Sequence, residues 1–433
     1  MHTQKVEYIV SQIRNVKCSK ISLNKKEVSH FVPLPSDARK HSTKIDVSNL
    51  NSIINIDPKK KICEAEPGVS FSDLIKETMN YNLVPCTVPE LKTITIGGAI
   101  SGCSIESMSY KYGGFHDSCI EYEIVTGEGK VITCSRKKSQ DIFEMLHGSY
   151  GTLGIITKIK FKLIEAKPFV QLIHEKHKSF DSYWNSLLKH CKNREYDFID
   201  SIIHKNKFVI CLGNFTEKSP YASEYFDSPY YFSTVKKEED FLTTYDYFFR
   251  YDTDCHWITK NFPLLSWSPF RKTIGKTVLG STNLITWSNR LSKILSLKKR
   301  QDIVVDVFLP SRKFPEFYKW YEKVFNYFPL WIVPYKAPIM YPWISKEHSK
   351  KMKETFFIDA AVYGKRNSGK IDLSEMLERK VFRLDGIKTL ISRNHYEKER
   401  FWQIYNKQNY NKVKAITDPH NIFQNFYDKM GRR

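Results

Sequence analysis

The chain lacks the features that mark secreted, membrane-spanning or metal-centred proteins. Its nine cysteines are scattered and contain no Cys-x-x-Cys pair, which argues against a zinc site, and their odd number argues against a disulfide framework. No run of roughly 18 apolar residues occurs, so we expect no transmembrane helix. The first residues, MHTQKVE, lack the basic and then apolar segments of a signal peptide. These absences, together with the lack of repeats and low-complexity segments, predict a cytoplasmic globular protein that is not secreted.

Positive charge is in excess. The chain has 68 Lys and Arg against 47 Asp and Glu, a net charge of +21 at pH 7. Such an excess is typical of proteins that bind nucleic acid or acidic membranes. A lysine-rich composition bias is the alternative, because the charges are dispersed and residues 59–61 form the only lysine triple. A basic surface would also suit acidic lipid headgroups or an anionic cofactor.

Short apolar strands and amphipathic helices alternate in the first third of the chain. The predicted elements are strands at 45–47 and 62–65 joined by a turn at 57–58, a helix at 70–80 capped by Ser70 or Ser72, a hairpin over 120–134, a helix at 140–146 capped by Ser139, and a strand at 154–163. This order indicates an α+β unit.

After Pro168 the pattern favours an antiparallel sheet backed by helices. The predicted elements there are strands at 169–177, 303–309, 330–335, 356–363 and 387–391, a hairpin over 198–215, and helices at 182–192, 314–327 and 397–413. A second domain is therefore expected.

Glycine is concentrated in two places within the first unit. Gly97, Gly98 and Gly102 form one cluster, and residues 148–154 hold three more glycines. Glycine is used this densely where backbone takes unusual dihedral angles or closely approaches a ligand. The spacing in 148–154 does not match the dinucleotide G-x-G-x-x-G turn, and Gly275-Lys276-Thr277 lacks the first glycine of a Walker A loop. The clusters point to a phosphate-rich cofactor, and their context to flavin.

Several segments are recognisable as family motifs. Residues 88–100 (VPELKTITIGGAI) and 151–157 (GTLGIIT) resemble the flavin-cradling and adenine-facing segments of the vanillyl-alcohol-oxidase-like FAD proteins. Residues 102–113 (GCSIESMSYKYG) look specifically like the delta(24)-sterol reductase (Diminuto/seladin) family. Similar segments follow in order at 329–334, 357–364 and 399–402, so the resemblance covers roughly residues 44–430.

The resemblance implies the domain organisation. It predicts an α+β fold with a PCMH-type FAD-binding domain of two subdomains at 1–167, a substrate (cap) domain with an antiparallel sheet backed by helices at 168–390, and a segment at 391–433 that returns to the flavin site.

It also implies the cofactor site. The anionic pyrophosphate of FAD is held largely by backbone N–H groups in glycine-permitted turns, with hydroxyls close by. The predicted cofactor-binding residues are Thr95, Ile96, Gly97, Gly98, Ala99, Gly102, Ser104, Glu106, Ser107, Ser109, Gly113, Gly151, Gly154 and, through its backbone, Ile156.

The chain departs from the wider superfamily in its first pyrophosphate loop. The corresponding residues, 25–33, contain no glycine, as in the sterol reductases. His30 is the one nearby candidate for a covalent flavin link, and a surface histidine is the simpler interpretation. We therefore expect non-covalent FAD.

Reduction of an isolated C=C bond needs hydride from flavin and a proton from the protein. The segment after the strand at 387–391 supplies Asn394, His395 and Tyr396 as candidate catalytic residues, with Asn394 where the family usually has an aspartate. Packing or surface positions are the alternative for His395 and Tyr396. Glu106 is a further candidate, which could instead hydrogen-bond flavin or ribose.

The middle of the chain is rich in aromatic residues, which suits a large apolar substrate pocket or a membrane-facing surface, with core packing as the alternative. The residues concerned are Tyr245, Tyr247, Phe248, Phe249, Tyr251, Trp257, Phe262, Trp267 and Phe270.

The leading hypothesis is an FAD-dependent oxidoreductase that reduces a C=C bond of a sterol or isoprenoid lipid. The family implies NADPH as electron donor; peripheral membrane contact is compatible with a lipid substrate, and neither a metal nor nucleic acid is expected. One alternative is an FAD-dependent oxidase or dehydrogenase of an alcohol, sugar or sugar lactone, because fold alone does not choose the chemistry. The other is a non-enzymatic basic binding protein on a flavin fold.

Overall fold

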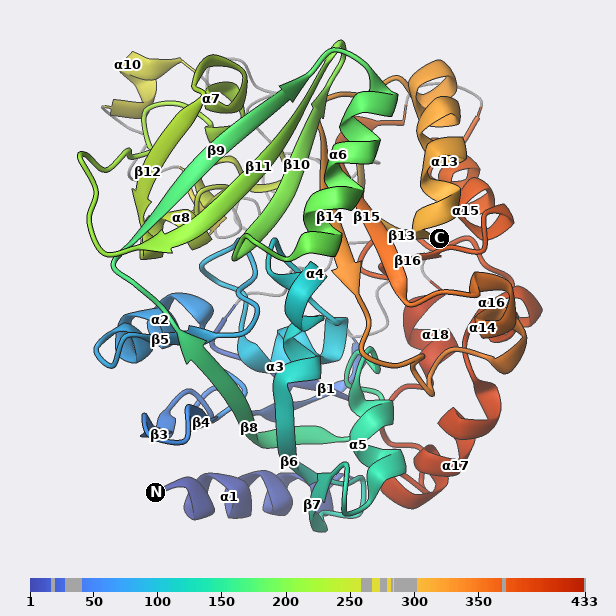
Figure 1. Cartoon of the computed structure of the whole chain (residues 1–433). Helices are drawn as coiled ribbons and strands as arrows, with labels where there is room; N and C mark the ends of the chain where they lie inside the picture. The colour runs from blue at the N-terminus through green and yellow to red at the C-terminus, as the bar shows by residue number, and fades with distance from the viewer. Residues whose placement is uncertain are drawn as a thin grey trace.

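The fold was analysed in a computed structural model that describes residues 1–16, 20–27, 41–257, 267–272, 279–281, 283, 302–367 and 371–431. Two large sheets lie one above the other in the view of Figure 1, and the C-terminal helices run along the side of both. The predicted α+β class is confirmed.

The lower unit, formed by the first 165 residues, is built on a six-stranded sheet. Its order is β3-β4-β8-β6-β7, with β5 paired to β8. The strands are β3 (Ile53–Asp57), β4 (Ile62–Ala65), β5 (Leu83–Pro85), β6 (Cys119–Val125), β7 (Val131–Ser135) and β8 (Ile155–Glu165); a separate parallel pair is formed by β1 (Ile21–Asn24) and β2 (Thr43–Asp46). Its helices are α1 (His2–Arg14), α2 (Phe71–Met79), α3 (Ile96–Gly102), α4 (Ser109–Tyr112), η2 (Phe115–Ser118) and α5 (Gln140–Leu146).

The upper unit is built on an eight-stranded antiparallel sheet of order β12-β9-β11-β10-β14-β15-β13-β16. The strands are β9 (Phe169–His177), β10 (Phe198–His204), β11 (Lys207–Thr216), β12 (Glu239–Thr243), β13 (Asp302–Pro310), β14 (Leu330–Lys336), β15 (Phe356–Arg366) and β16 (Ile387–Lys388). The helices between them are α6 (Phe180–Asn193), α7 (Tyr230–Lys236), α8 (Thr244–Phe248), η3 (Asp252–Trp257), α10 (Ser268–Phe270), η7 (Ser311–Lys313), α13 (Phe314–Trp320), a π-helical turn η8 (Tyr321–Phe325), α14 (Lys346–Met352) and α15 (Leu373–Arg383).

Three helices complete the chain: α16 (Lys398–Ile404), α17 (Lys407–Thr417) and α18 (Phe426–Met430). They contact both units. The buried Lys414 of α17 donates to the carbonyl of Thr152, and the amide of Asn394 donates to the carbonyl of Met430. The boundaries at 167 and 390 stay predictions; β8 ends at Glu165 and β9 begins at Phe169.

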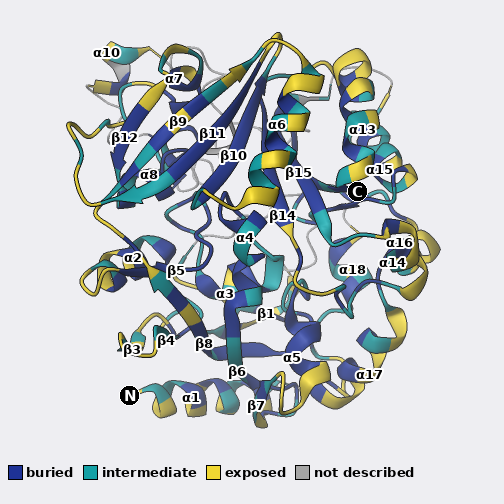
Figure 2. Cartoon of the chain, viewed as in Figure 1, coloured by how far each residue is buried: buried dark blue, intermediate teal, exposed yellow. Residues whose placement is uncertain are grey.

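Strand alternation gives the upper sheet two different faces. Val305 and Val307 of β13 and Ile358 and Ala360 of β15 belong to the core beneath α6, α13 and α15. The alternate residues face the lower unit and join its core. Figure 2 shows the central strands of the upper sheet buried, with exposed residues on the outer sides of the helices. Every second residue of β13 and β15 therefore faces the lower unit, and only these residues can line a site between the two units.

Most predicted elements are confirmed, with local corrections. The strand β3 was missed, so the turn at 57–58 joins β3 to β4; none of its residues is fully buried, and Ile54 is exposed. Ser70 caps α2 as predicted, by accepting from the N–H of Asp73. Ser139 does not cap α5 with its side chain, because its backbone is left-handed (φ 52°).

The predicted strand at 387–391 is only two residues long, and the predicted helix at 397–413 is two helices. Asn406 starts the second of these helices by accepting from the N–H of Asn409.

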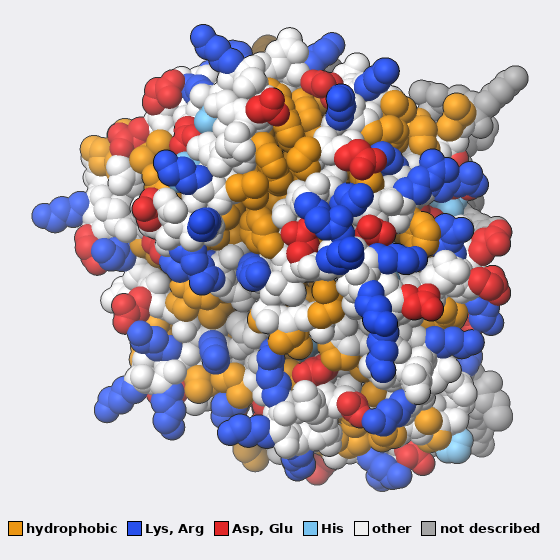
Figure 3. All heavy atoms as spheres, turned by 45° about the vertical axis from the view of Figure 1, so that its right-hand side comes forward, with side chains coloured by type: hydrophobic (Ala, Val, Ile, Leu, Met, Phe, Trp, Pro, Cys, Tyr) orange, Lys and Arg blue, Asp and Glu red, His pale blue; other side chains and the backbone are white. Residues whose placement is uncertain are grey.

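Lys and Arg side chains are spread over the face shown in Figure 3, with acidic side chains between them. Every helix in the described ranges is too short or too polar to cross a membrane.

Candidate functional site

A cavity of about 580 Å³ lies between the two units. Its volume falls within the roughly 300–1,000 Å³ of ligand pockets. We call the lining residues of segments 89–105 and 146–156 the floor; they belong to the lower unit. The roof is the set that lines the cavity from the upper sheet and from the segment after β16: Asp306, Phe308, Trp331, Asp359, Tyr363, Thr389 and Ile391.

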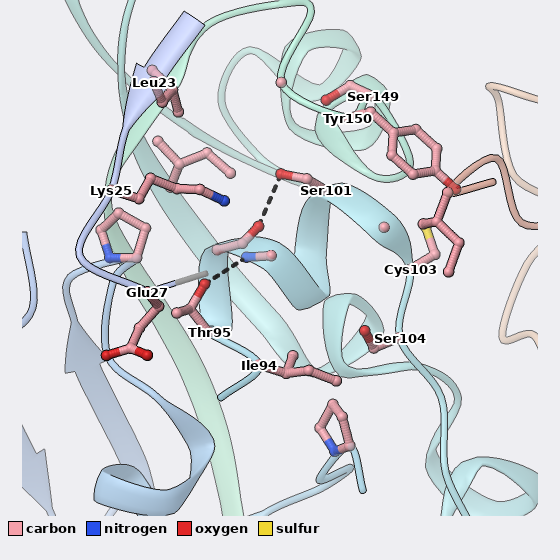
Figure 4. Close-up of a pocket in the computed structure, with 18 of the residues that line it drawn as sticks. Leu23, Lys25, Glu27, Ile94, Thr95, Ser101, Cys103, Ser104, Ser149 and Tyr150 are labelled. Atoms are coloured by element: carbon pink, nitrogen blue, oxygen red, sulfur yellow. Dashed lines mark hydrogen bonds between the residues drawn. The ribbon is translucent and has the colours of Figure 1, made fainter. Parts of the chain in front are cut away.

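The first half of the floor is the short helix α3 and the turn before it. Thr95 caps the helix by accepting from the N–H of Gly98 (3.2 Å), and Ser101 donates to the carbonyl of Gly97 (2.8 Å). Both hydrogen bonds are seen in Figure 4. Gly97 is required by close packing, because a Cβ there would lie 2.5 Å from Cβ of Pro67. The turn is thus held rigidly against the cavity.

Two other floor glycines leave space that the protein itself does not fill. A Cβ built on Gly102 meets no atom within 4 Å, and one on Gly151, whose φ is +69°, meets only Nζ of Lys429 at 3.8 Å. Both residues line the cavity. A cofactor that is held closely by backbone N–H groups needs such open space beside the backbone. The floor therefore fits the FAD that the sequence motifs imply.

Positive side chains line one wall of the same cavity. They are Lys25, Lys26, Lys44 and Lys429. Figure 4 shows the side chain of Lys25 pointing toward the turn formed by Thr95 and Ser101. The glycine-free segment thus presents lysines, whose charge complements a pyrophosphate. His30 lies outside the described residues.

The roof carries acids. Asp306 and Asp359 line the cavity from β13 and β15, and Glu90 approaches from the floor. Burial raises the pKa of Glu90 to about 8, and burial together with the neighbouring acids raises the pKa of Asp359 well above its usual range. The pKa of Asp306 is also raised by burial, against the hydrogen bonds from Tyr363 and Thr389. Protons are therefore held near the cavity at neutral pH.

A smaller apolar slot of about 70 Å³ adjoins the main cavity. The two share Gly102, Cys103, Ile105, Tyr150, Phe308 and Thr389. The remaining walls are mostly aromatic and aliphatic: Tyr335, Tyr341, Trp343, Ile344, Met352, Phe357, Ile387 and Tyr405. The hydroxyl groups of Tyr335 and Tyr341 hydrogen-bond to each other, and Tyr341 donates to Asp117 (2.6 Å). With their polar ends satisfied, these side chains can offer ring surface to an apolar ligand.

Glu106 lies outside the cavity lining, in a buried ionic network. Its carboxylate is 3.0 Å from the guanidinium of Arg250, which is also 3.1 Å from Asp200. Asp200 accepts from the indole N–H of Trp331 (2.8 Å). The network connects the lower unit to β10 and includes the contact to the roof residue Trp331.

Asn394, His395 and Tyr396 also lie outside the cavity lining. The amide of Asn394 donates to the carbonyls of Leu390, Ser392 and Met430, and its oxygen accepts from Lys388. The pKa of His395 is lowered by burial, and its Nε2 is 3.9 Å from Asp372. The predicted candidates thus hold the turn after β16, while Thr389 and Ile391 of the same turn line the cavity.

The predicted cofactor residues divide into two groups. Those that line the cavity are Thr95, Gly97, Gly98, Gly102, Ser104, Gly151, Gly154 and Ile156. Those that do not are Ile96, Ala99, Glu106, Ser107, Ser109 and Gly113. Ile96 and Ala99 are core residues, Ser109 accepts from the N–H of Glu106, and the carbonyl of Gly113 accepts from Thr87.

The aromatic stretch predicted as a substrate pocket packs in the core instead. Tyr247, Phe248, Phe249 and Tyr251 are buried in the main core cluster, and the side chains of Trp257, Phe262 and Phe270 lie outside the described residues. Trp267 is exposed. The aromatic slot comes from β14, β15 and their neighbours.

Sequence reasoning missed the acids around the cavity. Asp306 and Asp359 lie between apolar residues in the middle of their strands, in the segments IVVDVFL and FFIDAAV. A carboxylate at the centre of a buried strand is costly unless it is paired or functional. A carboxylate in the middle of an apolar strand was therefore the sequence signal that could have identified these two residues.

Comparison with known proteins agrees with this geometry. The FAD binding domain family matches residues 30–135. The Delta(24)-sterol reductase of Homo sapiens is 24% identical over 402 residues, which cover 88% of this chain and 76% of that protein. The Delta(24)-sterol reductase homolog of Caenorhabditis elegans is 24% identical over 477 residues, covering 100% and 88%. Cytokinin dehydrogenase 1 of Arabidopsis thaliana is 27% identical over 152 residues, 34% of this chain and 26% of that protein.

The resemblance found in the sequence is thereby confirmed. The chain carries an FAD-binding domain of PCMH type, and it is an FAD-dependent oxidoreductase similar to the sterol reductases over most of its length.

Proposed function

We propose that this chain reduces a C=C bond of a sterol or isoprenoid lipid, with FAD held in the large cavity and NADPH as electron donor. The observation that carries the proposal is the contact between the apolar slot and the cavity, which share six lining residues. An apolar substrate in the slot would lie against the cofactor site. The likeness to sterol reductases, which includes the slot-forming upper unit, supports the same substrate class.

The roles of the residues follow from their positions. The floor around Thr95, Gly102 and Gly151 would hold FAD, and the lysine wall would neutralise its pyrophosphate. Bound FAD supplies hydride. The aromatic slot, at about 70 Å³, would hold only an apolar end of the lipid; there it would orient the reacting bond and exclude water, which strengthens electrostatic interactions.

Binding of FAD is proposed to be non-covalent, through backbone and lysine contacts. A cytoplasmic location with peripheral membrane contact belongs to the same proposal, since the substrate class is lipid and basic side chains are spread over the surface. Acid precipitation of the protein should leave the flavin in the supernatant. Co-sedimentation with anionic vesicles, weakened by salt, tests the membrane contact.

The function is tested by anaerobic spectroscopy of the purified protein. NADPH should bleach the flavin absorbance, and an unsaturated sterol should restore it with formation of a product two hydrogens heavier. Flavin that NADPH leaves oxidised but an alcohol or sugar reduces would overturn the proposal in favour of an oxidase or dehydrogenase. Absence of flavin after reconstitution with FAD would favour a non-enzymatic binding protein.

The slot supplies a matched pair of variants. Phe357→Trp enlarges a side chain that lines the slot but not the large cavity, and Ile371→Trp makes a comparable change at an exposed position. The slot variant should weaken turnover of the sterol at least tenfold without loss of flavin, whereas the surface variant should behave like the parent chain.

A further inference from the structure

The roof holds two aspartates whose surroundings differ. In the antiparallel pair of β13 and β15, Asp306 lies opposite Ala361, and Asp359 lies opposite Phe308. The two aspartates are therefore diagonal neighbours on one face, roughly 7–8 Å apart in such a sheet. Both line the large cavity.

Asp306 is placed to remain ionised. The hydroxyl of Tyr363 donates to its Oδ1, and the hydroxyl of Thr389 lies 3.3 Å from its Oδ2. Thr389 also accepts from the backbone N–H of Asp306 (3.0 Å), which fixes the position of the hydroxyl. Donors to a carboxylate stabilise its charged form.

Asp359 is placed to hold a proton. It is 2% exposed, and its Oδ1 has no hydrogen-bond partner. Backbone hydrogen bonds from Val307 and Ala360 to the carboxyl group lower its pKa, but the effect of burial is larger. A buried carboxylate oxygen without a donor is costly when it is charged, and the cost is removed by protonation. The neighbouring acids favour the same state: the ionised Asp306 on β13 faces it, Glu90 on the floor adds a second negative charge only when it ionises, and Tyr363 on its own strand is neutral.

Among the described residues, neither ion pairing nor metal binding accounts for this group of acids. None of the ion pairs found in the described ranges involves Glu90, Asp306 or Asp359. Nor does any group of three or more His, Cys, Asp or Glu there have the arrangement of a metal site. An unpaired acid cluster that lines a cavity is the arrangement expected of a general acid.

We propose that Asp359 holds a proton beside the ionised Asp306 and delivers that proton to the substrate double bond. This assignment rests on the proposed function. The O–H bond of Asp359 breaks, and the π electron pair of the C=C bond forms a new C–H bond with that proton. A hydride from the reduced cofactor would form the second C–H bond at the other carbon, which bears the positive charge. The proposed donor NADPH would then restore the hydride, and water would restore the proton of Asp359.

The half-reactions are measured separately in Asp359→Asn. Reduction of the flavin by NADPH should stay within about twofold of the parent chain, and reoxidation by the sterol should slow at least ~100-fold, as expected for loss of a general acid. An infrared difference spectrum at neutral pH should show that the variant has lost the C=O band of a protonated carboxyl group. Reoxidation at the parent rate would overturn the assignment, as would loss of the reaction in Glu90→Gln with Asp359→Asn unaffected.

Asp306→Asn gives a second test that leaves Asp359 in place. Removal of the neighbouring negative charge lowers the pKa of Asp359, so the sterol-dependent rate should begin to fall at a lower pH than in the parent chain. An unmoved pH profile would show that Asp306 does not keep the proton on Asp359 and would overturn that part of the proposal. Asp240→Asn, which alters a buried aspartate of β12 outside the cavity, is the control and should leave the profile unchanged.

The outcomes separate this proposal from the proposed function. If no unsaturated sterol reoxidises the parent chain, the function fails, while the infrared band still reports whether Asp359 holds a proton. If the parent chain reduces the sterol and Asp359→Asn does so equally well, the function stands and the assignment fails.

Discussion

The floor of the cavity is made mostly of loops and a seven-residue helix, whereas the roof is made mostly of strands in the interior of a sheet. On the floor, glycines leave open space, and the lining residues come from two short segments, 89–105 and 146–156. On the roof, acids project between apolar neighbours, and they come from segments as far apart as Asp306 and Thr389. A pocket for a large cofactor can thus combine two devices. Glycines on the floor leave room for the cofactor, and polar side chains on the rigid sheet of the roof face it.

The largest expected effect comes from filling the open space on the floor. Gly102→Phe places a ring where the Cβ meets no protein atom within 4 Å, so the fold should accept it and the cofactor should not. We expect at least ~100-fold weaker FAD binding, measured by flavin fluorescence titration, with an unchanged circular dichroism spectrum. Gly102→Ala is the control, with an effect of less than tenfold. Full FAD content in the Phe variant would show that the cofactor lies elsewhere.

The junction between floor and roof depends on one buried cation. Arg250→Met leaves Glu106 and Asp200 buried without their counter-ion, and loss of one partner from a buried ionic group costs about 3–5 kcal/mol. Urea unfolding should show this loss in the free energy of unfolding. Arg379→Met, which removes an exposed pair with Glu375, should cost less than about 1 kcal/mol. Equal losses in the two variants would mean that the buried network does not join the units.

Glu90 of the floor lines the same cavity as the acids of the roof. Its pKa in the folded chain is raised to about 8, so the folded state binds a proton that the unfolded state releases near pH 4–5. This group therefore lowers stability as pH rises from about 5 to 8. Glu90→Gln should match the parent melting temperature near pH 4 and exceed it increasingly up to pH 8, as measured by thermal unfolding without cofactor. A constant difference across this range would contradict the raised pKa.

The smallest expected effect is the loss of stability caused by a change in the turn before α3. Thr95→Ala removes the cap of α3 and should lower the free energy of unfolding by about 1 kcal/mol, with weaker FAD binding. Ser139→Ala changes the residue before α5, whose side chain makes no capping hydrogen bond, and should have almost no effect. A loss of the same size at both positions would show that capping is not the cause.

Prediction from sequence succeeded where the signal is local. The helix at Phe71–Met79 has its cap and its apolar spacing within ten residues, and the glycines at 97, 98 and 102 lie in one motif. The turn after β16 was the weaker case. Thr389 and Ile391 of this segment line the cavity, but the predicted Asn394 does not, and its amide is occupied by carbonyls of its own turn and of Met430, which no local pattern reveals.

The sequence by itself determined the two units, the flavin-binding motifs and the excess of positive charge, because each depends on neighbouring residues or on composition. Only the tertiary structure decided which acids face the cofactor site and which aromatic side chains form the slot. The physical reason lies in the sheet: a shift of one residue in the pairing of β13 with β15 would turn Asp306 and Asp359 to opposite faces. That register is set by long-range packing of both faces against different cores, and not by the strands alone.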